Sequence, residues 1–262
     1  MASCVVSQNM DHSMSTAPQI EPMPPGIRDI LAPGGQMRAA INMSNFLLVS
    51  EKSKDGGPAG VSPSMAAAIA ALLDLDVKYV TYPNPGVLAD AANSDEWDIA
   101  LIGAEPQRAE FIAFTSAYSE IEATYLTGAD ASIQRIEDVD VKGRRIVVAE
   151  RTAYGLWLDR NIHNAELVSA NGLDASLELF CKGGFDALAG LRPRLITDVE
   201  QIPGARILDG RFMAVQQSVG VPKQKSAALA WLEKFVQAAI SQGFVADLIA
   251  KFGVKGLTVA GR

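Results

Sequence analysis

Residues 121–126, Ile-Glu-Ala-Thr-Tyr-Leu, and residues 213–219, Met-Ala-Val-Gln-Gln-Ser-Val, are two extended, β-prone segments far apart in the chain. One set of alternating strand-like and helix-like segments lies between them, at about 128–210, and a second set lies outside them. A domain inserted into another is joined to it by two crossing strands. We therefore expect two lobes with a hinge, and a ligand site in the cleft between the lobes.

Strand-like and helix-like segments alternate from Met37 onward. Strands are expected at 38–43, 76–82, 97–102, 145–149, 166–170 and 185–189, and helices at 62–73, 85–93, 152–160, 174–182, 224–241 and 244–252. Strands that alternate with helices of about 10–15 residues favour parallel sheets of the α/β class.

The predicted domain division follows from these segments. The first 30 residues are rich in Ser, Met and Pro without periodicity, which is typical of a disordered tail. The first lobe comprises residues 31–124 and 212–262, and the inserted second lobe comprises residues 125–211. No basic segment followed by an apolar stretch of about 7–15 residues precedes Arg28. As written, the sequence therefore predicts a cytoplasmic protein without a signal peptide.

The composition excludes several classes of protein. The 262 residues are 48% hydrophobic, which suffices for a substantial core. With 23 Lys and Arg against 30 Asp and Glu, the net charge is −7, so a nucleic-acid partner is not expected. Cys4 and Cys181 are far apart and His12 and His163 are the two histidines, so no metal site is expected. No nucleotide-binding or hydrolase glycine motif occurs, and we expect no cofactor and no catalytic residue.

Six short stretches occur in an order that resembles a known family. They are residues 31–41, 60–62, 97–100, Arg108 with 112–118, 185–190 and 219–223. Together they resemble the family 3 solute-binding proteins of ABC transporters, which have the type II periplasmic-binding-protein fold and include polar amino-acid receptors. The resemblance implies two α/β lobes joined by two crossing strands, a periplasmic location, and an ABC permease as a partner.

Arg108 is the site residue that the resemblance singles out. It lies shortly after the strand expected at 97–102, where the family places an arginine that holds a ligand carboxylate. The planar guanidinium donates two parallel hydrogen bonds to such a group. The alternative is a surface arginine that pairs with Glu105 or Glu110 at helical spacing.

Thr152 opens the helix expected at 152–160, and a helix N-terminus binds anions through its free N–H groups and partial positive charge. The resemblance makes Thr152 a ligand contact of the second lobe, a role compatible with that of an ordinary N-cap. Tyr82 and Tyr154 are candidates for the wall of the cleft, although half-buried structural tyrosines are more common. Asn42 and Asn45 are candidates for amide contacts or for turn formation.

The departures from the family pattern concern the ligand. Amino-acid receptors of the family commonly place an Asp for the ligand ammonium at the position where this chain has Leu191. Because an unpaired buried ammonium costs several kcal/mol, a plain α-amino acid in the usual mode is disfavoured. Arg192 follows directly. If it turns into the cleft, two guanidiniums suit a dicarboxylate; otherwise Arg192 is a solvated residue at a helix start.

The first lobe departs from the pattern as well. Leu101 and Gly103 stand where small hydroxyl residues often line the cleft, which leaves backbone N–H groups and Arg108 to hold the anion. Glu105 could instead pair with a cationic part of an amino-bearing ligand. On the returning strand Gln216 is the candidate, although alternation alone does not distinguish it from Gln217.

The leading expectation is a monomeric solute-binding protein, not embedded in a membrane, that closes on a small carboxylate-bearing solute (an organic acid or modified amino acid) for ABC-type uptake. Contacts that both lobes make only in the closed state would shift an open–closed equilibrium. One alternative is a cyclohexadienyl or arogenate dehydratase-like enzyme on the same fold, with Glu105 or Glu150 as general acid. Another is a cytosolic ligand-sensing module.

Overall fold

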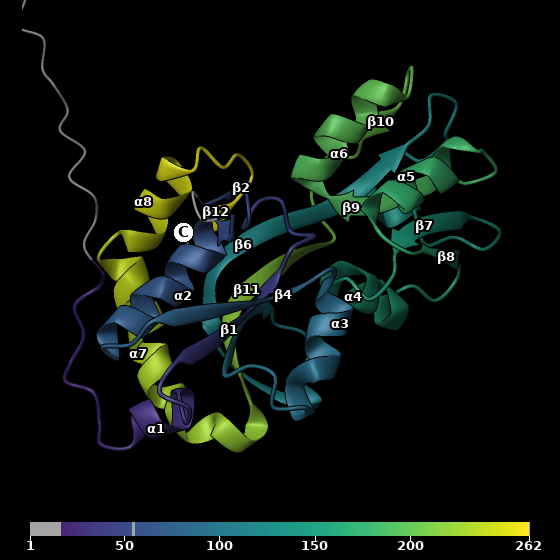
Figure 1. Ribbon diagram of the computed structural model, residues 1–262. Coiled ribbons are helices and arrows are strands. Elements are labelled where there is room, and N and C mark those ends of the chain that lie inside the picture. The colour runs from purple at the N-terminus through teal and green to yellow at the C-terminus, as the bar shows by residue number, and fades with distance from the viewer. Residues whose placement is uncertain (1–16, 54–55, 262) are drawn as a thin grey trace, which may run out of the picture.

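The computed structural model describes residues 17–53 and 56–261 (Figure 1). The strands are β1 (Met37–Asn42), β2 (Glu51–Lys52), β3 (Pro58–Ala59), β4 (Val77–Tyr82), β5 (Ile99–Gly103), β6 (Ile112–Thr127), β7 (Arg145–Ala149), β8 (Glu166–Ala170), β9 (Ala187–Leu191), β10 (Arg206–Ile207), β11 (Met213–Pro222) and β12 (Thr258–Val259). The α-helices are α1 (Ile27–Leu31), α2 (Val61–Leu72), α3 (Pro85–Asp90), α4 (Ala153–Asn161), α5 (Leu173–Cys181), α6 (Arg192–Asp198), α7 (Leu229–Ser241) and α8 (Phe244–Lys251). Short 3₁₀ turns include η2 (Arg108–Glu110) and η5 (Lys223–Ala228).

Within the described residues, ten strands form one sheet, whose main path is β4-β1-β5-β11-β6-β9-β7-β8. At one end β1 is parallel to β4 and β5, and at the other β7 is parallel to β8 and β9. Between these ends β6 and β11 pair antiparallel to each other. The mixed α/β class that the alternation predicts is confirmed.

The two crossing segments expected from the sequence lie in the middle of this sheet. β11 also pairs with β5, and β6 also pairs with β9, so the two strands connect the two parallel groups (Figure 1). The division into lobes stays a prediction. We keep its names, first lobe (residues 31–124 and 212–261) and second lobe (residues 125–211), for the two groups of elements that the ribbon shows.

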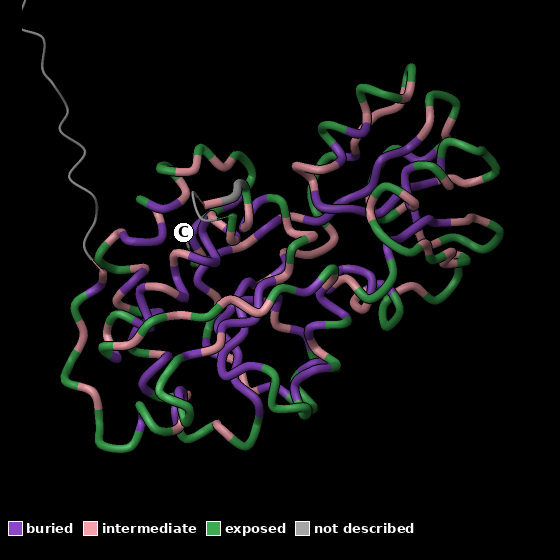
Figure 2. Tube along the Cα trace, in the orientation of Figure 1, coloured by how far each residue is buried: buried purple, intermediate pink, exposed green. Residues whose placement is uncertain are grey.

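The middle strand of each parallel group, β1 in one and β7 in the other, is buried on both faces, because helices cover the sheet on either side. In β1 the side chains of Met37, Ala39 and Ile41 belong to one apolar cluster and Ala40 belongs to another. In β7, Ile146 and Val148 face one way and Val147 the other. In β7 the alternation occurs within an unbroken apolar run, residues 146–149, which is typical of parallel strands covered on two sides. Figure 2 shows the resulting buried trace along the strands of both lobes.

Residues before the first strand do not follow the predicted tail throughout. Ala17, Ile20 and Met23 pack against the core, and the backbone N–H of Gln19 donates to Gln242 Oε1 at 2.9 Å. Residues 27–31 form α1, whose Ile27 and Leu31 are buried. The low periodicity of this segment therefore reflects packing through isolated apolar side chains. The rest of the predicted tail, residues 1–16 with Cys4 and His12, lies outside the described residues.

The part of the chain that the structure describes lacks two features. No helix there combines the length and the hydropathy needed to cross a membrane. No group of three or more His, Cys, Asp or Glu side chains is arranged there to hold a metal ion.

Candidate functional site

A small cavity of about 50 Å³ lies where the two lobes meet. It is lined by residues that come from both lobes and from β11: Asn42, Ser44, Asn45, Pro85, Gly103, Arg108, Thr152, Ala153, Tyr154, Leu173, Leu191, Val215 and Gln217. Six of the ten predicted site residues are in this set, namely Asn42, Asn45, Gly103, Arg108, Thr152 and Tyr154. The fold therefore brings most of the candidates to one place.

Arg108 is the charged residue of the cavity, and it is only 5% exposed. Its Nη1 donates to the carbonyl of Gly103 at 2.7 Å, and its Nη2 donates to the carbonyl of Arg151 at 2.9 Å. Burial lowers the pKa of Arg108 to about 10, although the charge of Glu105 opposes this effect. Within residues 17–53 and 56–261, no carboxylate lies within ion-pair distance of this guanidinium. The cavity thus contains a buried cation without an anionic partner.

The N-terminus of α4 faces the same cavity. Thr152 is its N-cap, as predicted: the Thr152 hydroxyl accepts a hydrogen bond from the backbone N–H of Gly155 at 3.0 Å. Thr152, Ala153 and Tyr154 all line the cavity. Burial raises the pKa of the Tyr154 phenol to about 12, which keeps it neutral at physiological pH. The free N–H groups of this first turn add positive potential beside Arg108.

Asn42 and Asn45, at the end of β1, have turn roles as well as a place at the cavity. The amide oxygen of Asn42 accepts from the backbone N–H of Ser44 at 3.1 Å, and that of Asn45 accepts from Leu47 N–H at 3.3 Å. Neither amide nitrogen donates to a partner within the described part of the chain. Asn42 and Asn45 therefore form turns and also line the cavity. Their amide nitrogens can still donate hydrogen bonds to a ligand.

Glu105 does not line the cavity. It is buried, and its carboxylate forms an ion pair with Arg160 at the other end of α4 and accepts from the backbone N–H of Gln107 at 2.9 Å. The sequence analysis considered a pairing with Arg108 or with a ligand. The partner lies instead in the second lobe, 55 residues along the chain.

Arg192 also lies outside the cavity, in contrast to the arrangement with two guanidiniums. Its Nε donates to Glu122 Oε2 at 2.9 Å, and its Nη2 donates to the carbonyl of Gly210. It is the first residue of α6, and Pro193 follows it there. Leu191, directly before it, does line the cavity. The cavity therefore has an aliphatic side chain at the position where amino-acid receptors of the family commonly have an Asp.

Tyr82 and Gln216 are the other two candidates outside the cavity. Tyr82 is buried in an apolar cluster with Trp97, and its hydroxyl donates to Glu96 at 2.8 Å. The Gln216 side chain donates back to the carbonyl of Ala214 at 3.2 Å, whereas Gln217 is buried and lines the cavity. Gln216 and Gln217 pair in regular register with Glu120 and Ser119 of β6, so the two side chains point to opposite faces and only Gln217 reaches the cavity.

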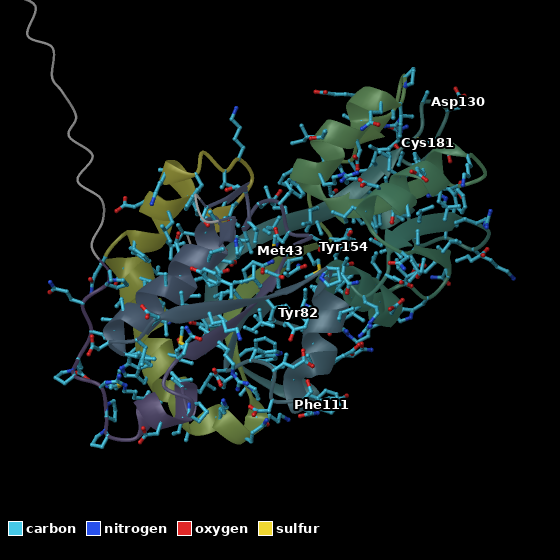
Figure 3. All side chains as sticks on the ribbon, viewed as in Figure 1. Met43, Tyr82, Phe111, Asp130, Tyr154 and Cys181 are labelled. Carbon is cyan, nitrogen blue, oxygen red and sulfur yellow. The ribbon has the colours of Figure 1, made fainter. Side chains whose placement is uncertain are left out.

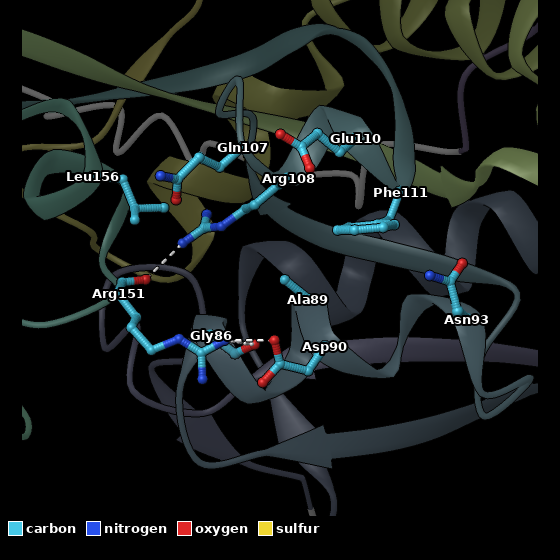
Figure 4. A pocket seen from close by; sticks show the side chains of 10 residues that line it. All are labelled: Gly86, Ala89, Asp90, Asn93, Gln107, Arg108, Glu110, Phe111, Arg151 and Leu156. Carbon is cyan, nitrogen blue, oxygen red and sulfur yellow. Dashed lines mark hydrogen bonds and ion pairs between the residues drawn. The ribbon is translucent and has the colours of Figure 1, made fainter. Parts of the chain in front are cut away.

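A larger, open cleft of about 530 Å³ lies on the other side of Arg108 (Figure 4). Gly86, Asp90 and Phe111 of the first lobe line it, together with Arg151 and Leu156 of the second. Figure 3 shows Phe111 at the edge of the first lobe and Tyr154 near the junction of the two lobes. Arg108 therefore lines both the small cavity and the larger cleft.

Residues 40–255 match the model of the bacterial extracellular solute-binding proteins, family 3. The chain belongs to this family. No curated protein matches the sequence.

Solved structures similar to this solute-binding protein share its fold at low sequence identity. A mutant of ArgBP from T. maritima superposes with a TM-score of 0.68 at 18% identity, over 87% of this chain and 100% of that one. The ancestral amino acid-binding protein AncCDT-1, a precursor of cyclohexadienyl dehydratase, gives 0.68 at 19% identity, over 87% and 99%. A binding component of an ABC transporter from Wolinella succinogenes, complexed with lysine, gives 0.69 at 18% identity, over 85% and 97%. These likenesses establish the type II periplasmic-binding-protein fold.

Proposed function

We propose that this solute-binding protein holds a small carboxylate-bearing solute between its lobes, with the carboxylate on Arg108 and the N-terminus of α4, and delivers it to an ABC permease. The observation that carries the proposal is the buried guanidinium of Arg108, which lacks a carboxylate partner among the described residues. A buried charge is stable when it is paired and hydrogen-bonded. Its two contacts to carbonyl oxygens satisfy two N–H groups and leave the positive charge for an anion.

The surrounding side chains support an anionic ligand rather than a zwitterion. The residues that line the cavity include Arg108 and no Asp or Glu. Leu191, Leu173 and Val215 form an apolar wall, which suits a short hydrocarbon body and does not compensate an ammonium. Similar proteins have been solved with arginine, lysine or glutamate. For this chain we propose an organic acid, or an amino acid whose amino group is modified.

The size of the cavity supports an opening and closing cycle. Pockets for small molecules usually measure about 300–1,000 Å³, whereas this cavity measures about 50 Å³. It has room for a few water molecules. The lobes must therefore separate to admit a solute of even four or five carbon atoms, and must close less tightly around it.

A dehydratase-like activity is the alternative on this fold, and the site offers little for it. A general acid must come within hydrogen-bond reach of the substrate. Glu105 is engaged by Arg160 and by the Gln107 N–H, outside the cavity, and Glu150 is exposed. Neither acid considered for this role lines the cavity, and we give binding precedence over catalysis.

A thermal-unfolding screen tests the proposal. Succinate, 2-oxoglutarate, pyruvate and lactate are compared with alanine, glutamate, lysine and arginine. A ligand at 100 times its Kd stabilises the folded state by about 2.7 kcal/mol, or roughly 5–10 °C for a chain of this size. We expect acids without an amino group to raise the Tm more than amino acids do, and Arg108→Ala to abolish the rise.

Arg135→Ala is the matched control, since Arg135 pairs with Asp138 at 3.3 Å within the second lobe, away from the cavity. It should leave the ligand-induced rise in Tm unchanged. A strong response to alanine, or a response to acids that survives Arg108→Ala in a folded variant, would contradict the proposal. Turnover of prephenate or arogenate by the wild-type protein would favour the enzyme instead.

A further inference from the structure

Helix α4 is attached to the opposite lobe at both ends. At its N-terminal end, Arg151 Nη2 lies 2.6 Å from Asp90 Oδ1 and donates to the carbonyl of Gly86 at 3.1 Å, both in the first lobe (Figure 4). At its C-terminal end, Arg160 forms an ion pair with Glu105, also in the first lobe. We call these contacts the α4 clasp. These contacts join the two lobes directly, without a ligand between them.

The backbone at Arg151 has an unusual conformation. Its φ is +58°, in the left-handed region that disfavours residues with a Cβ. A strained residue of this kind persists only when its surroundings hold it, and such residues gather at clamps and switches. Here the strained peptide directs its carbonyl to Arg108 Nη2, 2.9 Å away, while the side chain reaches Asp90. Arg151 therefore positions Arg108 and crosses between the lobes at the same time.

Gly86 provides the surface on which Arg151 lies. A Cβ at Gly86 would come within 2.7 Å of Arg151 Nε and 2.8 Å of its Cζ. The guanidinium thus packs directly against the first turn of α3. Close packing of this type requires the lobes to be fully shut on this side.

The two ends of the clasp differ in strength. Asp90 and Arg151 have side chains that are 64% and 47% exposed, and an exposed pair of this type contributes about 0.2–1 kcal/mol at most. The side chain of Glu105 is only 2% exposed, so separating it from Arg160 while it stays buried leaves an uncompensated charge. The Glu105–Arg160 pair therefore dominates, and the Arg151 contacts fix the orientation of the helix.

We propose that the α4 clasp holds the two lobes shut in the absence of ligand, so that solute gains access only when the clasp opens. In this chain an arginine at each end of α4 forms an ion pair with a carboxylate of the first lobe, Arg151 with Asp90 and Arg160 with Glu105. Arg151 acts as a positioning residue, because its carbonyl holds Arg108 in the closed state.

Small-angle X-ray scattering tests this on the full chain, freed of bound solute by unfolding and refolding. The wild-type protein is compared with Arg160→Gln, Asp90→Asn and the double variant. Arg145→Gln is the control, since Arg145 pairs with Glu166 at 3.3 Å within the second lobe. The side chains of that pair are about as exposed as those of Arg151 and Asp90. Thermal unfolding verifies that each variant is folded.

We expect the ligand-free wild-type protein and the control to scatter as the closed arrangement does. The double variant should have a larger radius of gyration, with Arg160→Gln closer to it than Asp90→Asn is. Hydrogen exchange of ligand-free protein gives a second measure: amides at 103–108 and 151–155 should exchange at least about tenfold faster in the double variant, corresponding to a loss of about 1.4 kcal/mol. Arg151→Gly, which permits the same backbone conformation, should keep the amides at 103–108 more protected than Arg151→Ala does.

Two results would overturn the proposal. One is a ligand-free wild-type protein that already scatters as an open molecule. The other is a folded double variant whose scattering and exchange match those of the wild-type protein. Because neither measurement uses a ligand, failure here is independent of whether the cavity binds a carboxylate.

Discussion

The guanidinium of Arg108 donates through Nη2 to the carbonyl of Arg151, 2.9 Å away, and this bond joins a residue of the first lobe to one of the second. Arg151 in turn contacts Asp90 of the first lobe. A series of contacts therefore leads from Arg108, the proposed ligand anchor, to Arg151 in the second lobe and back to Asp90 in the first. Changes at either residue are expected to affect both solute binding and the closure of the lobes.

Arg108→Lys separates charge from geometry. Lysine keeps a positive charge and loses the planar fork that contacts Gly103, Arg151 and a carboxylate together. Since a hydrogen bond to a charged group contributes about 1.5–3 kcal/mol, we expect binding of the best acid in the screen to weaken by roughly 10–100-fold. Isothermal titration calorimetry measures this. Unchanged affinity would mean that the acid is held elsewhere.

Leu191→Asp supplies the carboxylate that the cavity lacks. We expect the variant to gain a thermal shift with alanine, because the new carboxylate can pair with the ammonium while Arg108 holds the carboxyl group. Leu191→Asn, similar in size to the aspartate and uncharged, is the control and should not respond. If alanine stabilises the wild-type protein as much as it stabilises Leu191→Asp, the inference from Leu191 is wrong.

Gly86→Ala acts on the clasp without removing a charge. The added methyl group meets the Arg151 side chain, so that side chain must leave Asp90 or the lobes must part. Overpacking of this kind costs about 1–3 kcal/mol, which here falls mainly on the closed state. Hydrogen exchange at 151–155 should increase.

The control for that variant is Gly34→Ala, where no atom lies within 4 Å of the added Cβ. It should exchange as the wild-type protein does. Equal protection in Gly86→Ala and Gly34→Ala would show that contact between Arg151 and Gly86 does not limit opening.

Asp98 predicts a dependence of stability on pH. Burial by itself would raise the pKa of Asp98, but hydrogen bonds from Arg38 and Lys225 outweigh it and hold the pKa below its usual value. A carboxyl group whose pKa is lower in the folded state adds stability above the unfolded-state pKa of about 3.9, and this stability is lost as the pH falls through the folded-state pKa.

Asp98→Asn should therefore lower the free energy of unfolding by roughly 3 kcal/mol at pH 7, because Lys225 loses its carboxylate partner and Arg38 keeps only Asp95. The difference from the wild-type protein should shrink below about pH 4, as urea unfolding at several pH values would measure. A difference that stays constant down to pH 2 would contradict this account.

The sequence predicted those features that depend on local pattern. Residues 145–149 form β7 as expected, the two crossing segments pair as β6 and β11, and Thr152 caps α4. The strand and the N-cap follow from periodicity and capping chemistry within a short stretch, and the crossing segments follow from the set of alternating elements that lies between them. The family resemblance predicted that Arg108 lies at the site, because it related this residue to the end of a strand, and Arg108 does line the cavity.

Long charged side chains were less predictable. Glu105 pairs with Arg160 and Arg192 pairs with Glu122, and each partner lies more than 50 residues away along the chain. Helical spacing identifies only neighbours on one element, so such partners appear only after the lobes are assembled. Alternation along β11 did not distinguish Gln216 from Gln217, and the structure places Gln217 at the cavity.

The exposed Asp90–Arg151 contact makes dissolved ions an effector of this molecule. At 1 M salt the Debye length falls to about 3 Å, and attraction between solvent-accessible groups is largely screened. Concentrated brine would then loosen one end of the helix while the sheltered Glu105–Arg160 pair persists. Because the sheltered pair dominates, salt should shift the balance between open and closed lobes by no more than the contribution of the exposed pair, about 0.2–1 kcal/mol.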